Sequence, residues 1–251
     1  MGVLDNYSNQ ARSYDRTRSA SPSVLAPLRA GLAGAPGPRL ADIGGGTGNY
    51  ALALEREGWE PVVIDRSSAM LTGAREKGLA TIHADAQRLP LDDASFDAAM
   101  LVSMLHHVDD PTAALIEAKR ILRVEGRLAV MLYTREDIED LWLLDLFPST
   151  RAWMHNTHPH LADIFAQLPG AQRRPVLFED LQDASLAALA SHPEKVLDEK
   201  WRTQTSYFER LQRDNPRELH AGLQSLHAKL AAGWTPNAPG RASVLSWTKL
   251  A

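Results

Sequence analysis

Four glycines occupy five consecutive positions within the segment LADIGGGTGNY, which spans residues 40–50. They follow a short apolar run and precede a stretch that reads as a helix. Glycines occur at this density where the backbone must turn sharply or lie close to another group. A strand that enters such a turn and continues into a helix presents backbone N–H groups and the helix N-terminus to a ligand beyond the end of the strand.

Strands and helices alternate after this turn, which constrains the fold further. The apolar runs that predict strands are RLADIG, EPVVIDRS, ATIHADA, FDAAMLVSM and GRLAVMLYT. Ser67 or Ser68 is placed to cap one of the intervening helices. This alternation requires right-handed crossovers and predicts a parallel sheet with helices on both faces. It stops after Thr134, although RRPVLFEDL and RASVLSWTKL read as two further strands.

Length and composition predict one large domain, or a domain with a cap, that acts on small molecules. The chain has 251 residues, a net charge of -4 and no cysteine. The small negative charge gives no electrostatic case for a nucleic-acid partner. The lack of cysteine excludes disulfides and thiolate metal sites and favours a cytoplasmic location. No segment is apolar over the length that spans a bilayer. We expect a monomer or a homodimer.

The spacing of the glycines separates two classes of cofactor. A dinucleotide site requires G-x-G-x-x-G, but Gly44, Gly46 and Gly48 give G-x-G-x-G, and Asn49 stands where the third glycine would be. Asp42 lies just before the glycines, where a carboxylate would repel a pyrophosphate but could orient a loop that holds a cationic ligand. This favours S-adenosylmethionine, whose sulfonium and ammonium groups are positive.

The segment DIGGGTGNY resembles the first motif of the class I S-adenosylmethionine-dependent methyltransferases. HADAQRLPLDDASFDAAM resembles the third-strand motif of that family, and SMLHHVDDP and EAKRILRVEGRLAVM resemble its segments after the fourth strand and into the fifth. The resemblance covers roughly residues 5–134 and is to the subgroup around the ubiquinone and menaquinone biosynthesis methyltransferases and their natural-product relatives. It implies a Rossmann-like α/β sheet, mostly parallel with an antiparallel last strand, and a helical cap insertion.

The same resemblance implies which residues bind the cofactor. Asp65 ends the second strand, where an acidic side chain can accept both ribose hydroxyls. Asp85 would accept a hydrogen bond from the adenine amino group. Tyr14 would cover the methionine moiety, and Ser103 would line it through its backbone. The full set of candidates for binding S-adenosylmethionine, and its product S-adenosylhomocysteine, is Tyr14, Asp42, Gly44, Gly46, Gly48, Asp65, Arg66, Asp85, Ala86 and Ser103.

His106 and His107 follow the fourth strand and are the candidate catalytic residues. An imidazole with a pKa near neutrality suits a general base, although a structural loop histidine is the alternative. Because the two residues leave a strand in succession, their side chains should diverge and at most one should face the acceptor. The segment HNTHPH, with His155, His158 and His160, lacks the helical i, i+4 pair and the nearby carboxylate of a metal site, so no metal is expected.

We therefore expect an N-terminal helical segment over the cofactor (1–33), a cofactor-binding core (34–134) and a final strand (231–251). Between the core and this strand lies a mostly helical cap for the acceptor (135–230), with a sixth strand near 174–181. The predicted function is methyl transfer to an O, N or C atom of a small organic acceptor in quinone-type or specialised-metabolite biosynthesis. A nicotinamide-dependent oxidoreductase, and a protein that keeps the cofactor site without methylating, are the alternatives.

Overall fold

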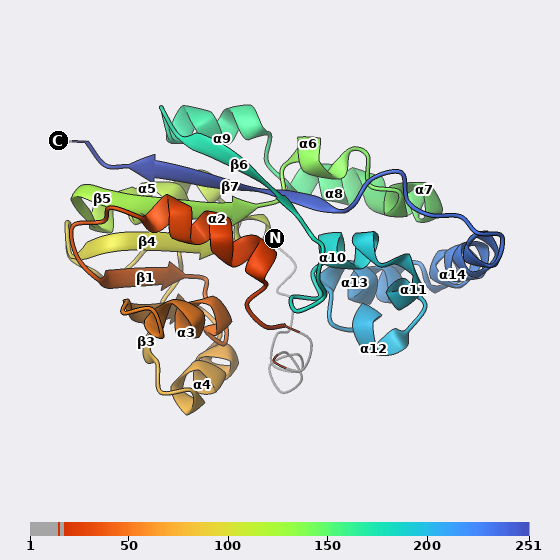
Figure 1. The fold of residues 1–251 in the computed structure, drawn as a ribbon, viewed down its shortest axis with the longest axis horizontal. Coiled ribbons are helices and arrows are strands. Elements are labelled where there is room, and N and C mark those ends of the chain that lie inside the picture. Colours follow the sequence, from red (N-terminus) through yellow and green to blue (C-terminus); the bar gives the residue numbers. More distant parts are fainter. Residues whose placement is uncertain (1–14, 16–17, 251) are drawn as a thin grey trace.

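The computed structural model describes residue 15 and residues 18–250, which form a seven-stranded sheet flanked by helices (Figure 1). The strand order is β3-β2-β1-β4-β5-β7-β6. The first five strands are parallel, β7 is antiparallel to β5, and β6 is antiparallel to β7. The strands are β1 (Arg39–Ile43), β2 (Glu60–Asp65), β3 (Ala80–His83), β4 (Phe96–Val102), β5 (Leu122–Leu132), β6 (Gln172–Leu177) and β7 (Arg241–Thr248). The predicted mostly parallel α/β sheet with an antiparallel last strand is confirmed.

Successive side chains of each strand point to opposite faces of the sheet, and both faces are covered. On β4, Ala98 and Met100 belong to one apolar cluster, whereas Ala99 and Leu101 belong to the other. Burial on both faces explains why the parallel strands read as continuous apolar runs. The first face is covered by α2 (Pro22–Leu32), α3 (Asn49–Glu55) and α4 (Ser68–Glu76), and the second by α5 (Pro111–Ile121) and α9 (Leu161–Gln167).

Two core helices begin at side chains that cap them. The hydroxyl of Ser67 accepts a hydrogen bond from the backbone N–H of Met70 at the start of α4, as the sequence predicts. At the start of α5, Asp110 accepts from the N–H of Ala113 at 3.0 Å, and Pro111 occupies the first helical position. These caps fix where the chain leaves β2 and where it leaves the loop after β4.

The fifth strand begins earlier than the sequence predicts. The pattern predicts a strand from Gly126, but β5 starts at Leu122, directly after α5. Glu125 has a φ of 65°, and the pairing with β4 shifts between Phe96 and Ala98. Glu125 and Gly126 therefore mark an irregularity inside the strand and not a turn before it.

The helices after β5, apart from α9, form a cap at one end of the sheet (Figure 1). Pro193 and Pro216 start new helices, so the helical stretch predicted between residues 185 and 230 is divided. The elements of the cap are α6 (Arg135–Ile138), α7 (Leu143–Leu146), η2 (Pro148–Thr150), α8 (Arg151–Thr157), α10 (Leu186–Ser191), α11 (Pro193–Val196), α12 (Glu199–Arg202), α13 (Ser206–Asp214) and α14 (Pro216–Ala231). The apolar cluster under α2 continues into this cap through Met131, Phe147 and Phe208.

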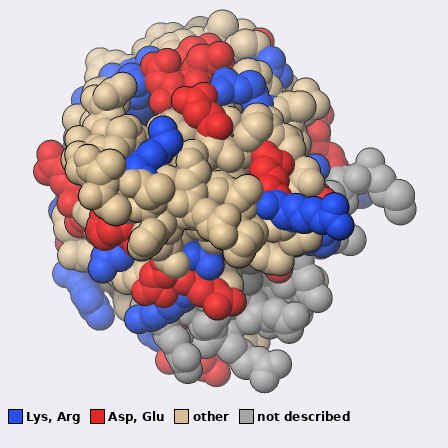
Figure 2. Space-filling view, turned by 90° about the vertical axis from the view of Figure 1, so that its right-hand side faces the viewer, with Lys and Arg blue, Asp and Glu red and all other residues tan. Residues whose placement is uncertain are grey.

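The outer surface of the cap end carries charges of both signs. Figure 2 shows Lys and Arg interspersed with Asp and Glu among the described residues of this face. A mixed surface of this kind provides no extended field of one sign to steer a strongly charged partner. Within the described part of the chain, none of the helices has the length and apolar character needed to cross a bilayer.

Candidate functional site

A large cavity lies where the carboxyl ends of β1, β2 and β4 meet. Open α/β sheets bind ligands at this edge, next to the point where the strand order reverses. We call the lining residues between 42 and 108 the sheet side of the cavity, and those between 137 and 241 the cap side. The sheet side includes the predicted Asp42, Gly44, Gly46, Asp65, Arg66, Asp85, Ala86, Ser103, His106 and His107.

The glycine turn follows β1 and leaves backbone open to the cavity. Gly46 has a φ of 58°, and a Cβ atom built on it would meet nothing closer than the sulfur of Met70 at 4.0 Å. Gly48 also has a positive φ, of 74°, but a Cβ there would collide with Leu79. The two glycines therefore serve different purposes. Gly46 leaves space that a ligand can occupy, whereas Gly48 permits close packing of the turn against the core.

Asp65 binds the glycine turn as well as facing the cavity. Its carboxylate accepts hydrogen bonds from the backbone N–H groups of Gly46 at 2.9 Å and Ser67 at 2.7 Å. Burial raises the pKa of Asp65, and these two hydrogen bonds oppose that rise. A carboxylate offers about four acceptor positions, so two remain for the hydroxyls of a ribose.

Asp42 is a buried carboxylate with an oxygen that lacks a partner. Its side chain is 1% exposed, and Oδ1 has no hydrogen-bond partner among the described residues. Burial, with a smaller contribution from the charge of Asp65, raises the pKa of Asp42 to about 8. Buried polar atoms are almost always hydrogen-bonded, so this orphan suits a ligand that brings a donor or a positive charge. Together with the open backbone at Gly46, it fits S-adenosylmethionine.

Four further predicted cofactor residues, Arg66, Asp85, Ala86 and Ser103, line the sheet side with differing local roles. The carboxylate of Asp85 accepts hydrogen bonds from the backbone and side chain of Gln87, so it stabilises a turn where adenine binding was predicted. Ser103 has a φ of 53°, a strained conformation that is typical of functional sites. Arg66 and Ala86 border the cavity. Tyr14 lies outside the described residues.

A polar cluster ties the segment before α2 to the cap. Asp183 accepts hydrogen bonds from Arg18 at 2.8 Å and from the hydroxyl of Tyr50 at 2.8 Å. All three residues line the cavity. The sequence does not predict the roles of Tyr50 and Asp183, because residues 133 positions apart become neighbours only in the fold.

The two predicted catalytic histidines lie together in η1 (Leu105–His107), a short 3-10 turn after β4. Their ring centroids are 3.9 Å apart, so the expectation that the side chains diverge is wrong. The expectation assumed the alternation of an extended strand, whereas the 3-10 turn brings successive side chains closer. Burial lowers the pKa of His106 well below its ordinary value, with further lowering by His107, His158 and Arg18.

His158 enters the same cavity from the end of α8 and stacks on His106. The ring centroids are 5.0 Å apart and the planes are 11° from parallel. The His158 Nδ1 atom lies 2.9 Å from the carbonyl oxygen of Met154, and burial lowers the pKa of His158 to about 4. The sequence pattern around His158 raises only the question of a metal ligand. Within residue 15 and residues 18–250, no group of three His, Asp or Glu side chains could hold a metal ion.

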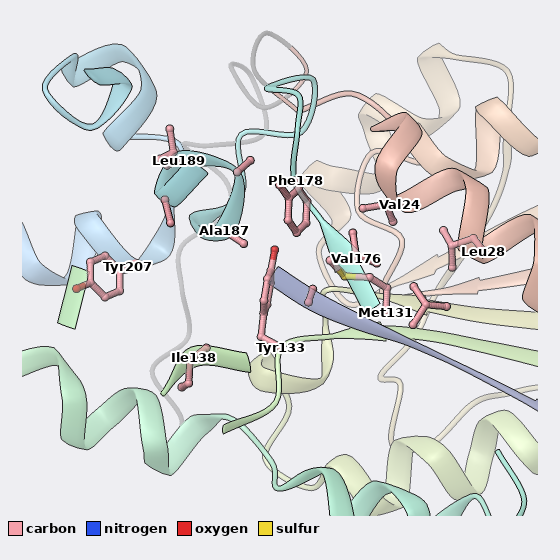
Figure 3. Close-up of a cluster of buried hydrophobic side chains, with 14 of the residues drawn as sticks. Val24, Leu28, Met131, Tyr133, Ile138, Val176, Phe178, Ala187, Leu189 and Tyr207 are labelled. Atoms are coloured by element: carbon pink, nitrogen blue, oxygen red, sulfur yellow. The ribbon is translucent and has the colours of Figure 1, made fainter. Parts of the chain in front are cut away.

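Tyr133 follows β5 and stands between the sheet side and the cap side. Figure 3 shows its ring at the strand end with the hydroxyl directed toward the part of α10 that carries Ala187. The hydroxyl is buried and has no hydrogen-bond partner of normal geometry among the described residues. Burial raises its pKa. The position of Tyr133 directly after a strand that ends at the cavity is the sequence signal that indicates its place in the site.

Comparison with known proteins agrees with this geometry. Residues 41–130 match the family model of a methyltransferase domain. A demethylmenaquinone methyltransferase from Clavibacter sepedonicus is 31% identical to this chain over 160 residues, which cover 55% of this chain and 62% of that protein. The match therefore spans less than two thirds of the length of that relative.

Two solved structures have the same fold. A presumed methyltransferase from an antibiotic biosynthesis pathway of Anabaena variabilis superposes with a TM-score of 0.79 at 24% identity, covering 92% of this chain and 99% of that one. An S-adenosylmethionine-dependent methyltransferase from Thermotoga maritima, described as a possible histamine N-methyltransferase, has a TM-score of 0.55 at 26% identity and covers 70% of this chain and 86% of that one. The predicted resemblance is confirmed, since residues 41–130 match a methyltransferase domain and the described chain has the Rossmann-like fold of S-adenosylmethionine-dependent methyltransferases.

Proposed function

We propose that this protein binds S-adenosylmethionine and transfers its methyl group to a small organic acceptor. The observation that carries this proposal is the sheet side of the cavity. Three features meet there, within the segment that matches a methyltransferase domain. They are the open backbone at Gly46, the carboxylate of Asp65 and the orphan oxygen of Asp42. Each of these features fits a different part of the cofactor.

Several residues of this chain would hold the cofactor. Asp65 retains acceptor capacity for the ribose hydroxyls, and Asp42 would face a donor or a positive charge. Asp85 and Ala86 border the space expected for adenine. The sulfonium of the bound cofactor supplies an activated methyl group. The main tasks of the protein are then to align the acceptor and to exclude water.

The cap side supports a small organic acceptor, of the quinone type or another specialised metabolite. The names of the relatives include both a demethylmenaquinone methyltransferase and a possible histamine N-methyltransferase, so the similarity does not fix the atom that is methylated. His106 and His107 stay the candidate catalytic residues of the sheet side. We also expect a cytoplasmic monomer or homodimer without a nucleic-acid partner.

Titration calorimetry with S-adenosylhomocysteine tests the cofactor site. We expect binding to the natural protein and at least about tenfold weaker binding to Asp65→Ala, because two ribose hydroxyls lose their acceptor. Asp163→Ala, which removes an exposed carboxylate from α9, is the matched control and should bind normally. Equal affinity of the Asp65 and Asp163 variants would contradict the assignment.

Two further measurements separate the alternatives. Thermal stabilisation by NAD, but not by S-adenosylhomocysteine, would favour an oxidoreductase, because a ligand that binds the native state raises its stability. Mass spectrometry of acceptors incubated with S-adenosylmethionine distinguishes a methyltransferase from a protein that keeps the site without methylating. A gain of one methylene unit in the acceptor is the expected result.

A further inference from the structure

The cap side of the cavity is apolar over much of its lining. Its apolar and aromatic residues come from α6, α8, α10 and α13 and from the loop after α6; they are Ile138, Leu141, Trp153, Met154, Leu186, Ala187 and Tyr207. Walls of this kind fit the flat or hydrophobic body of a small molecule, with a few polar groups to orient it.

Each charged group on the cap side already has a charged partner elsewhere in the chain. Asp183 binds Arg18 and Tyr50, as described above. Asp137 accepts hydrogen bonds from Arg173 at 3.0 Å and from Ser243 at 3.0 Å. Arg241 contacts Asp140 at 3.2 Å. An ionised acceptor buried here would find its counter-charges engaged, which is costly, so the described part of the cavity favours a neutral acceptor.

His158 presents a hydrogen-bond acceptor to this apolar space. A carbonyl oxygen can only accept, so the contact between Nδ1 and the Met154 oxygen at 2.9 Å puts the ring hydrogen on Nδ1. Thr157 Oγ1 lies 3.1 Å from the same nitrogen. Nε2 therefore carries the lone pair, and no described residue forms a hydrogen bond with it. A partner that fixes the tautomer in this way is typical of a histidine that acts as a base.

Two neighbouring rings hold His158 in place. His106 stacks on it at 5.0 Å, and Tyr133 meets it edge-on at 6.3 Å. The lowered pKa of His158, about 4, keeps the ring neutral at pH 7 and able to take up a proton. The ring of Tyr133 also lies 6.2 Å from that of His106, so the three rings form one cluster beside the cavity.

We propose, resting on the methyltransferase function above, that the acceptor is a neutral hydroxyl compound with a flat apolar body and that Nε2 of His158 accepts its hydroxyl proton. In this proposal His106 stacks on the base and positions it, in place of the general-base role that the sequence predicts for His106. The preference of the site for a hydroxyl follows from its paired charges, which leave a cationic amine without a counter-ion, and from the lone pair at Nε2.

The transfer balances in atoms and charge. The acceptor oxygen forms a bond to the methyl carbon while the S–C bond breaks, and sulfur keeps the electron pair and becomes a neutral thioether. The O–H bond of the acceptor breaks, and its proton moves to Nε2, which gives an imidazolium that later releases the proton to solvent. A weak base suffices, because bonding to carbon makes the hydroxyl proton strongly acidic.

A pair of matched probes tests the class of acceptor. 1-Naphthol and 1-naphthylmethylamine share one ring system, but at pH 7 the first is neutral and the second is a cationic amine. With S-adenosylmethionine, we expect 1-methoxynaphthalene from the first and at least about tenfold slower transfer to the second, measured by mass spectrometry against authentic standards. Preferred transfer to the amine, methylation at a ring carbon of 1-naphthol, or no transfer to either probe overturns the proposal.

His158→Asn tests the base, because asparagine keeps a donor near the position of Nδ1 and lacks Nε2. We expect kcat with 1-naphthol to fall by roughly 10²-fold or more, with unchanged calorimetric affinity for S-adenosylhomocysteine. His160→Asn is the control, since His160 is half-exposed and contacts Arg135 outside the cavity lining. Equal kcat values for the two variants overturn the role of His158.

Nitrogen-15 NMR of histidine in the S-adenosylhomocysteine complex gives a readout that does not depend on turnover. The signal that is lost in His158→Asn should report a neutral ring protonated at Nδ1 at pH 7, and 1-naphthol should shift its Nε2 resonance. A ring protonated at Nε2, or an Nε2 resonance that does not respond, contradicts the proposal. Loss of S-adenosylhomocysteine binding by the natural protein would instead contradict the proposed function on which it rests.

Discussion

At the scale of single residues, substitution by alanine should have different effects at Gly46 and Gly48 of the turn. Gly46→Ala places its Cβ in open space within the cavity, so it should cost about 1 kcal/mol of strain and weaken S-adenosylhomocysteine binding at least tenfold. Gly48→Ala directs its Cβ into Leu79 and should destabilise the fold more than Gly46→Ala does.

Urea denaturation and calorimetry of the two glycine variants check this difference. The strain from a positive φ is similar at both positions, so the comparison isolates what each Cβ meets. Stronger destabilisation by Gly46→Ala than by Gly48→Ala would show that the space beside Gly46 belongs to packing and not to a ligand.

Asp42 should make stability depend on pH. Its pKa of about 8 in the folded protein exceeds the usual value of 3.8, so the folded state binds a proton that the unfolded state releases. The resulting stabilisation is complete below about pH 4 and is lost as the pH rises through 8. Asparagine does not titrate, so Asp42→Asn does not lose stability in this way. The free energy of unfolding of Asp42→Asn minus that of the natural protein should therefore increase from pH 5 to pH 8, by up to about 4 kcal/mol.

The measurement is urea denaturation of both proteins at several pH values, because the titration of all other groups largely cancels in the difference. A difference that stays constant between pH 5 and pH 8 would mean that Asp42 is ionised throughout in the folded protein. The orphan oxygen would then need a partner from outside the described residues.

At the scale of elements, Asp183 connects three segments that are far apart in the sequence. It binds Arg18 before α2 and Tyr50 on α3 from the loop between β6 and α10. The side chains of Arg18 and Asp183 are 14% and 9% exposed. Asp183→Asn should therefore destabilise the protein by on the order of 3 kcal/mol, because it removes a negative charge that lies 2.8 Å from a largely buried guanidinium.

Asp140→Asn provides the comparison for this ion pair. Asp140 pairs with Arg241 at 3.2 Å, but its side chain is 74% exposed, so its removal should cost less than about 1 kcal/mol. Chemical denaturation of both variants checks the prediction. Equal effects would show that the cluster around Asp183 does not hold the cap against the core.

At the scale of the whole molecule, the cap and the sheet share one apolar cluster and should unfold together. Phe208 of α13 is buried in the cluster that also contains Met100 of β4. Phe208→Ala should cost about 3–5 kcal/mol, and the slowest-exchanging amides of β4 should lose protection by the same free energy. Native-state hydrogen exchange measures this. Protection lost in the cap alone would show that the cap unfolds as an independent unit.

The sequence by itself determined the strands, the glycine turn and much of the sheet side of the cavity. These features are local, since periodicity marks each strand and the spacing of Gly44, Gly46 and Gly48 marks the turn. Asp42 and Asp65 could be predicted because both lie at strand ends that a parallel sheet brings to one edge. The resemblance to the methyltransferase family predicts an antiparallel last strand, and β7 does pair antiparallel with β5.

Only the tertiary structure decided the cap side and the arrangement of the histidines. His106 and His158 are 52 positions apart, and their stacking depends on where α8 ends relative to η1. The ion pair of Arg18 with Asp183 likewise joins residues separated by 165 positions. No periodicity or turn residue encodes such contacts, because they result from the packing of every element between them. The sequence therefore determined where a cofactor can bind, and the packing of the cap decided which side chains face an acceptor.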